Sequence, residues 1–391
     1  MEGSQLPNFQ QFCEHQFDLR ERLGSLKDAR PAPQISAGVV AEAICFMGAL
    51  GLGSLLQCDQ ELRTEVGQAW FGHASSVVSD TTISRSLAGM PVDPIRTMLL
   101  SAYQEGRAAG QSKWEGALGK FRVGIVDGTS FGTSLASCVE IVGQSALLVD
   151  MEPIPKRGKE LPASTTLLRR VQPALGTGRL DLVLGDGLYF NAPFFTLCLD
   201  DLHCDVLVKT DDARREVIVD AMGLFRTPPG QFTGIVRAEG LDLERLCTYQ
   251  MAMASGFAMD GVDEEVTVVW IREEYLKKDL TVEFWVIFTH RYGPGLTIED
   301  ARELGHLRWD VETHGFKEFN QTMHSKHGYS HDPQVMMPLE LLLSLMFILL
   351  QVFRQHLEER FKRMYPGMKH TRRFCYRKIR NGLEHPTSPG T

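Results

Sequence analysis

The chain has 391 residues, of which 43% are hydrophobic, and a formal net charge of −8 at pH 7. This apolar content excludes a wholly disordered chain, and the length predicts two or three domains. The eight cysteines are scattered without a CxxC pair, so neither a zinc knuckle nor a disulfide framework is indicated. Scattered cysteines suit a reducing cytoplasm, and the polar N-terminus lacks the features of a signal peptide.

Residues 1–118 are predicted to form a mainly helical region. The apolar stretch 37–56 is interrupted by Glu42 and by several Gly and Ser residues, which favours a buried helix over a membrane span. Residues 79–85 offer N-cap side chains ahead of a helix that runs towards Leu87.

Two apolar runs in the middle of the chain each end in Asp-Gly. The first is 121–127, ending at Asp127, and the second is 180–186, ending at Asp186. Each predicts a buried strand that ends at a carboxylate, and the following glycine allows a sharp turn. The alternative is a pair of ordinary Asp-Gly turns, because both residues are common in turns.

The segment around these runs predicts an alternation of strands and helices. Residues 119–210 indicate strand, strand, strand, helix, strand, helix, strand. The second, third and fifth strands are expected at 139–142, 146–149 and 205–208, and the helices at 165–171 and 192–199. Residues 211–289 instead predict a mostly β insertion, with β-rich runs at 264–271 and 280–288. Its many acidic residues argue against direct contact with phosphate.

A third carboxylate lies in the run 307–317. On a helix, Arg308, Glu312 and Phe316 are four residues apart, so all three lie on one face. The alternative is an ordinary surface ion pair between Arg308 and Glu312.

Together, the three stretches resemble insertion-sequence transposases of the DDE class, whose catalytic domain is RNase H-like. In that family one Asp lies on the first strand, a second lies just after the fourth, and a Glu follows an Arg by four on a later helix. The matching residues are Asp127, Asp186, Glu312 and Arg308. Runs 158–162, 186–191 and 308–316 are similar to one branch in particular, and the resemblance covers roughly residues 119–352. Many relatives have Tyr three residues before the Arg and Lys seven after the Glu, where this chain has Gly305 and Phe319.

The resemblance implies an α/β fold in which an RNase H-like mixed sheet is flanked by helices. The catalytic domain would comprise 119–210 and 290–353, with 211–289 as the β-rich insertion and 1–118 as a helical region with a DNA-binding role. The implied partners are double-stranded DNA, as transposon ends and as target, and a second copy of the chain in a DNA-bound homodimer. No membrane is implied, and the expected location is the prokaryotic cytoplasm, at the nucleoid.

The implied activity is DNA transposition by two-metal-ion catalysis. Two divalent ions about 4 Å apart activate a water or a 3′-hydroxyl and stabilise the leaving oxygen. Mg²⁺, with Mn²⁺ as a substitute, prefers oxygen ligands, which Asp127, Asp186 and Glu312 supply. Two alternatives stay open: a domesticated or inactive relative that binds DNA without cutting, and an RNase H-like nuclease without strand transfer. The presence of all three carboxylates favours an active enzyme over a binding protein.

The C-terminal part begins with an apolar run at 337–353. Pro338, Glu340 and Gln351 favour a core helix over a membrane span. The preceding segment, with His324, Lys326, His327 and His331, is expected to be a polar loop rather than a metal site, with Lys326 as a candidate phosphate contact.

Residues 354–391 are expected to form a basic tail. Residues 354–380 contain ten Lys and Arg but only two Glu, and four aromatic residues are interleaved with the basic ones. Such a segment can bind DNA phosphates, although a solvated basic surface is the alternative. Besides Lys326, the candidate DNA contacts are Arg360, Lys362, Arg363, Lys369, Arg372, Arg373, Arg377 and Lys378.

Overall fold

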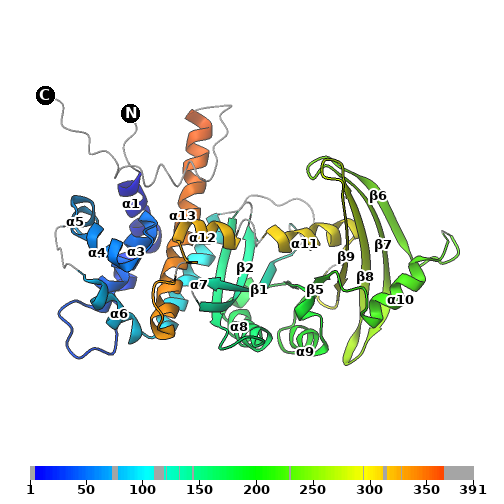
Figure 1. Ribbon diagram of the computed structural model, residues 1–391, viewed down its shortest axis with the longest axis horizontal. Helices are drawn as coiled ribbons and strands as arrows, with labels where there is room; N and C mark the ends of the chain where they lie inside the picture. The colour runs from blue at the N-terminus through cyan, green and yellow to red at the C-terminus, as the bar shows by residue number, and fades with distance from the viewer. Residues whose placement is uncertain are drawn as a thin grey trace.

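The computed structural model describes residues 5–72, 78–109, 119, 121–131, 133–142, 145–228, 230–293, 295–310, 315–326 and 328–364. The molecule is elongated, with a helical part at one end and a long sheet extending to the other (Figure 1). It is a mixed α/β protein with one large mixed sheet.

The helical end is built from the N-terminal residues. Its helices are α1 (Leu6–Phe17), α2 (Leu19–Gly24), α3 (Ala37–Leu50), α4 (Leu55–Leu62), α5 (Glu65–Phe71), α6 (Asp80–Ala88) and α7 (Val92–Ala109). Hydroxyl side chains cap four of them by accepting a backbone N–H, which satisfies an otherwise unpaired donor. The caps are Ser36, Ser54, Thr64 and Ser79, and the last confirms the predicted start of α6.

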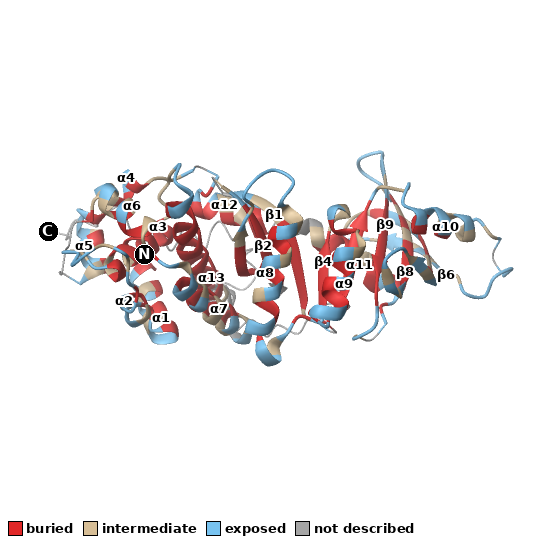
Figure 2. Ribbon diagram, turned by 90° about the horizontal axis from the view of Figure 1, so that it is seen from below, coloured by how far each residue is buried: buried red, intermediate tan, exposed pale blue. Residues whose placement is uncertain are grey.

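Helix α13 (Pro333–Met364) is the central element of the C-terminal part, and the short α12 (Lys317–Met323) precedes it. Its segment Pro333–Leu357 is long and apolar enough to cross a membrane, but the most apolar window lies entirely inside the protein. Figure 2 shows this buried stretch between the helical end and the sheet. These observations support the predicted core helix. The bent pair α3 and α4, with 99° between them, passes the same test of length and composition.

The C-terminal tail does not begin where the sequence suggested. Helix α13 continues to Met364, so the boundary predicted at residue 354 falls inside a helix. Arg354 is only 1% exposed, and the ring of Phe353 lies 5.3 Å from that of Phe9. The buried Phe353 and Leu357 hold the start of the basic segment, including Arg354, in the core.

Nine strands form one continuous sheet in the order β3-β2-β1-β4-β5-β9-β8-β7-β6. They are β1 (Val123–Phe131), β2 (Thr133–Val142), β3 (Ser145–Pro153), β4 (Leu182–Gly185), β5 (Asp205–Thr210), β6 (Val236–Asp242), β7 (Cys247–Met259), β8 (Val262–Tyr275) and β9 (Leu280–Phe288). β4 is parallel to both β1 and β5, and all other neighbours are antiparallel. The predicted first five strands are all present.

The helices that follow these strands in the sequence pack on the sheet. Helix α8 (Glu160–Ala174) packs on β2 and β3, and α9 (Ala192–Thr196) continues into a π-helical turn, Leu197–Asp201, before β5. Helix α10 (Glu216–Phe225) precedes β6, and α11 (Ile298–Asp310) lies across β4 to β9. Helix α7 packs on β3, where the guanidinium of Arg96 pairs with Asp150 and Glu152. The helical end is therefore joined to the sheet by ion pairs as well as by apolar contacts.

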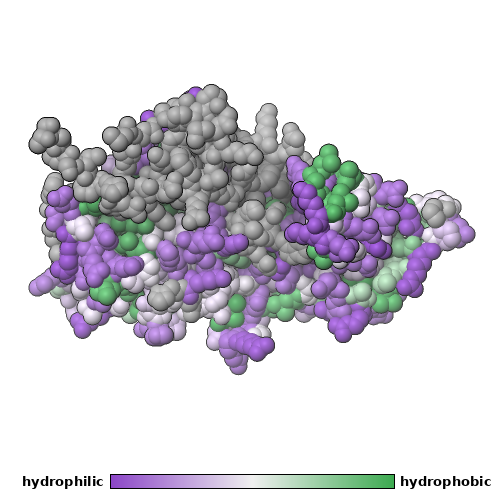
Figure 3. Space-filling view, turned by 45° about the horizontal axis from the view of Figure 1, so that its top comes forward, coloured by the Kyte–Doolittle hydropathy of each residue, from purple (hydrophilic) through white to green (hydrophobic). Residues whose placement is uncertain are grey.

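The β-rich segment 211–289 extends the main sheet. Strand β9 pairs with β5, and β8, β7 and β6 follow outwards from it. Four leucines near the β6–β7 and β8–β9 turns are largely exposed, namely Leu241, Leu243, Leu276 and Leu280. Most of the surface drawn in colour in Figure 3 is hydrophilic, and hydrophobic patches are visible at several places, including the sheet end.

Candidate active site

The first two predicted carboxylates lie level with one another on neighbouring strands. Asp186 follows the last residue of β4, as predicted, but β1 does not end at Asp127: it continues through Gly128 to Phe131, so Asp127 lies within the strand and no turn follows it. The parallel register pairs Ile125 with Leu184, two residues before each aspartate. Because successive residues of a strand alternate between faces, equal spacing from a registered pair directs both side chains to the same face. Two Asp residues 59 positions apart in the sequence are thereby brought side by side.

Arg308, in the last described turn of α11, joins the two aspartates. Its Nη2 lies 3.2 Å from Oδ2 of Asp186 and 3.7 Å from Oδ1 of Asp127. The Arg308 and Asp127 side chains are largely buried, whereas that of Asp186 is one-third exposed. The predicted Arg308 and both predicted aspartates therefore converge on one place, which is open to solvent on the Asp186 side.

A tight turn fixes the position of Asp186. Its Oδ1 accepts the backbone N–H of Leu188 at 2.8 Å and so caps the 3₁₀ turn Gly187–Tyr189. A side chain at Gly187 would place its Cβ 2.9 Å from Oγ1 of Thr210 on β5, which is closer than atoms pack. The Asp-Gly turn considered as an alternative is thus also present, and it is part of the site.

Tyr189 ties this turn to α8. Its buried hydroxyl lies 2.9 Å from Oγ of Ser164 and donates a hydrogen bond of 3.1 Å to Oε1 of Glu160. Burial raises the pKa of Tyr189, with the Glu160 and Asp127 carboxylates adding to the shift, so the phenol stays a donor at neutral pH. The same Glu160 carboxylate lies behind Gly128, where an added Cβ would come within 2.5 Å of it. One helix therefore supports the backbone next to both aspartates.

Lys209 is a basic group at the site that the sequence did not single out. The register pairs Gly185 with Val208, so Lys209 is level with Asp186 on the next strand, β5. Its side chain is buried, with Nζ 4.0 Å from the centroid of the Phe284 ring. Burial lowers the pKa of Lys209 to about 7; Arg308 adds to that shift, while Glu273 opposes it. Its one signal in the sequence is its position, directly after the predicted strand 205–208.

A buried polar cluster anchors α11 on the outer strands. The Glu273 carboxylate, on β8, accepts from Nε of Arg302 at 2.6 Å and lies 2.7 Å from Nε2 of His306. Burial opposes ionisation of Glu273, but its His306 and Arg302 partners outweigh burial and lower its pKa to about 2. Burial also lowers the pKa of His306. Arg302 and His306 lie six and two residues before Arg308, so the cluster fixes the part of α11 that carries the arginine.

The two positions at which the sequence differs from the family pattern that it resembles, Gly305 and Phe319, are both packed. A Cβ at Gly305 would lie 3.0 Å from Cγ2 of Val286 and 3.2 Å from Cε2 of Phe284, so α11 sits directly on β9. Phe319 is buried, with its ring 5.1 Å from that of Phe347. Both positions therefore lie in closely packed parts of the protein.

Other predicted residues lie away from this cluster or outside the described part of the chain. Lys326 is exposed in the loop between α12 and α13, and Arg360 and Arg363 are exposed on the last turns of α13. Glu312, His327, Lys369, Arg372, Arg373, Arg377, Lys378 and the side chain of Lys362 lie outside the described residues. Within the described residues, which omit Glu312, no three His, Cys, Asp or Glu side chains are grouped to hold a metal.

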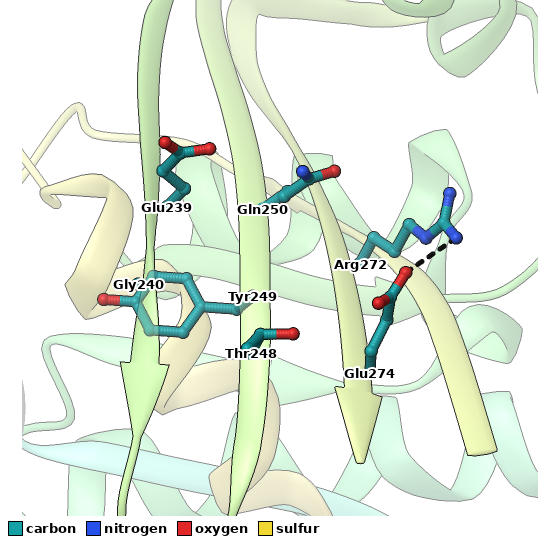
Figure 4. Close-up of a pocket in the computed structure, with 7 residues that line it drawn as sticks. All are labelled: Glu239, Gly240, Thr248, Tyr249, Gln250, Arg272 and Glu274. Carbon is teal, nitrogen blue, oxygen red and sulfur yellow. Dashed lines mark hydrogen bonds and ion pairs between the residues drawn. The ribbon is translucent and has the colours of Figure 1, made fainter. Parts of the chain in front are cut away.

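A concave surface elsewhere on the molecule is unrelated to the aspartates. A cavity of about 380 Å³ lies over β6, β7 and β8, lined by Glu239, Gly240, Thr248, Tyr249, Gln250, Arg272 and Glu274 (Figure 4). Nη2 of Arg272 donates to Oε1 of Glu274 at 2.8 Å. None of the predicted site residues lines this cavity.

Comparisons with known proteins reveal a distant structural likeness. No protein-family model matches the chain, and no curated protein sequence matches it. Among solved structures, the piggyBac transposase in a synaptic complex with hairpin DNA aligns over 97% of this chain and 86% of its own, with 10% identity and a TM-score of 0.40. At this level the likeness establishes neither a shared fold nor a shared activity.

Proposed function

We propose that the protein is a DDE-class DNA transposase that cuts and joins phosphodiester bonds at the ends of a mobile element. The observation that carries the proposal is the convergence of Asp127 and Asp186 on one nitrogen of Arg308, at 3.7 and 3.2 Å. These are three of the four residues that the sequence resemblance picked out, and they come from distant parts of the chain. Glu312, one helical turn beyond Arg308 in the sequence, is proposed as the third carboxylate.

The arrangement of the first five strands supports an RNase H-like catalytic domain. Their order is β3-β2-β1-β4-β5, with β2 antiparallel and β4 and β5 parallel to β1. The first aspartate is on the first strand and the second directly follows the fourth. This is the placement that the resemblance to DDE transposases implies.

The donor set suits Mg²⁺, because carboxylate oxygens of Asp127 and Asp186 lie within 4 Å of the same Arg308 nitrogen and hard cations prefer carboxylates. When bound, a pair of Mg²⁺ ions activates the attacking hydroxyl and stabilises the leaving oxygen. The aspartates would hold the ions, with Mn²⁺ as a substitute. Arg308 and the buried Lys209 would provide positive charge for the phosphate.

Double-stranded DNA is the proposed partner. The exposed Arg360 and Arg363 at the end of α13 continue into the basic residues 369–380, which supports a phosphate-binding role for that segment. A DNA-bound homodimer, a DNA-binding role for the region around α6, and a location at the prokaryotic nucleoid remain parts of the proposal. A binding protein without cleavage and a nuclease without strand transfer are the competing functions.

One assay separates these functions. Purified protein is incubated with Mg²⁺ or Mn²⁺ and with DNA that carries the sequences flanking its own gene. A transposase yields both cleaved ends and joined products. Cleavage without joined products would identify a nuclease, and a gel shift without any cleavage would identify a binding protein.

A further inference from the structure

The guanidinium of Arg308 lies next to carboxylate oxygens of Asp127 and Asp186, the groups that would bind a metal ion. Its Nη2 lies 3.2 Å from Oδ2 of Asp186 and 3.7 Å from Oδ1 of Asp127. The side chains of Arg308 and Asp127 are 13% and 11% exposed, so water screens their attraction only weakly. Charge-assisted contacts of this kind are among the stronger polar interactions in proteins.

A divalent cation and the guanidinium compete for this space. Mg²⁺ binds its oxygen ligands at about 2.0–2.1 Å. A cation held by the carboxylates of Asp127 and Asp186 would lie close to the Arg308 guanidinium, and like charges repel strongly in a poorly solvated site. Lys209, buried and level with Asp186 on β5, adds further positive charge nearby when it is protonated.

Helix α11 is held in place close to Arg308, so its position does not depend on the contacts of the Arg308 side chain. Arg302 and His306 bind Glu273 within the fold, which fixes the helix two residues before Arg308. Because the helix is held there, we expect the guanidinium to leave the aspartates by rotation of its side chain and not by movement of the helix. The partly exposed side of Asp186 is where an incoming phosphate would meet it.

We propose that Arg308 is an internal counter-ion that competes with divalent cations for Asp127 and Asp186, and that DNA phosphate relieves the competition by drawing the guanidinium away. The inference rests on the proposed function, because it takes the two aspartates as metal ligands. Metal and DNA then bind cooperatively, and by linkage each raises the affinity for the other by the same factor. The free enzyme would be poorly loaded with metal until its substrate arrives.

The test measures Mn²⁺ affinity directly, by the electron paramagnetic resonance signal of free Mn²⁺, and so does not depend on activity. Arg308→Gln should bind Mn²⁺ about tenfold more tightly than the wild type in the absence of DNA. A duplex that carries one flanking end of the gene, with its own Mn²⁺ binding subtracted, should raise the affinity of the wild type by a similar factor. The same duplex should leave Arg308→Gln nearly unchanged.

Two further variants make the result specific. Arg169→Gln removes the same charge from an exposed pair with Asp201 on the surface and should leave Mn²⁺ affinity unchanged. Arg308→Lys keeps the positive charge and should show a smaller gain than Arg308→Gln. Circular dichroism and thermal unfolding show whether each variant is folded, and if only one Arg308 variant folds, its comparison with the wild type carries the test.

The outcomes separate this inference from the proposed function. If Asp127→Asn loses Mn²⁺ binding while Arg308→Gln binds no more tightly than the wild type, the counter-ion role is wrong and the metal site stands. If Mn²⁺ binding is insensitive to Asp127→Asn and to Asp186→Asn, the aspartates are not metal ligands, and both proposals fail.

Discussion

Lys209 is a buried, ionisable side chain at the site, and its charge is expected to lower the stability of the folded protein. Its ammonium is taken out of water at the level of Asp186, and the centroid of the Phe284 ring lies 4.0 Å from it. Burial is the main reason that its pKa falls from the ordinary 10.5 to about 7. Such a group costs folding energy while it is charged, as functional residues often do.

Lys209→Met should therefore stabilise the protein at pH 7, by on the order of 2 kcal/mol. The unfolded chain keeps this lysine protonated up to about pH 10.5, whereas the folded protein releases the proton near pH 7. The unfolded state binds more protons between these values, so wild-type stability gains from this group as the pH rises through that window. Urea unfolding should show that the free energy of unfolding of Lys209→Met exceeds that of the wild type by less at pH 10 than at pH 7. A constant difference would mean that the Lys209 pKa is not lowered.

Packing at Gly305 explains why this chain cannot carry a tyrosine there. Gly305→Tyr should destabilise the protein by at least about 3 kcal/mol, because even a Cβ there lies 3.0 Å from Val286. Gly305→Ala is the matched control: its steric cost is partly offset by a gain in helix propensity of about 1 kcal/mol. Thermal unfolding of the two variants measures the difference. A Gly305→Tyr protein as stable as the wild type would show that α11 does not sit directly on β9.

At the scale of elements, α11 depends on strands that the sequence did not connect to it. The Glu273 carboxylate lies on β8, in the outer part of the sheet, and yet it binds Arg302 and His306 of the helix that carries Arg308. Asp242, at the end of β6, also binds Arg302, at 3.0 Å. The outer strands thus position one side of the candidate site.

Glu273→Gln should cost about 3 kcal/mol at pH 7, because it removes the charge that pairs with a buried arginine. The folded pKa of Glu273, about 2, is below the ordinary 4.5, so its stabilisation is complete above about pH 4.5 and is lost as the pH falls towards 2. The wild type should lose stability over that range more steeply than the variant. Equal acid dependence of the two proteins, measured by denaturant unfolding, would contradict the buried charge pair.

The elements near the first two carboxylates were predictable from the sequence, because local patterns determine them. The apolar runs before Asp127 and Asp186 form β1 and β4, and the residues at 192–199 form α9 and the start of the π-helical turn. The pairing of β9 with β5, which makes one sheet of nine strands, was not predictable, because it joins residues such as Leu207 and Phe288 that are far apart in the sequence. Lys209 was missed for the same reason, since only the register of β4 and β5 places it beside Asp186.

On the scale of the whole molecule, the basic segment after α13 concentrates positive charge in a chain that is acidic as a whole. Since α13 is part of the core up to at least Leu357, a clean truncation begins at residue 365. Deleting 365–391 should weaken binding to all DNA sequences and flatten the plot of log affinity against log salt by about 0.9 for each phosphate that the protein no longer neutralises. Preference for the element's own ends should change less, because phosphate contacts carry no base information. An unchanged slope in the folded truncated protein would make the segment a solvated surface.

The most direct test of the central claim compares the wild type with Asp127→Asn on DNA that carries the flanking ends of the gene, scoring cleavage and binding in the same samples with Mg²⁺. The amide has nearly the size of the carboxylate but is a poor metal ligand, and removing a negative charge near phosphate should not weaken binding. We expect Asp127→Asn to bind the DNA as the wild type does and to cut at least about a thousandfold more slowly, a barrier increase of about 4 kcal/mol. Cleavage by Asp127→Asn at the wild-type rate would contradict the assignment of Asp127 as a metal ligand.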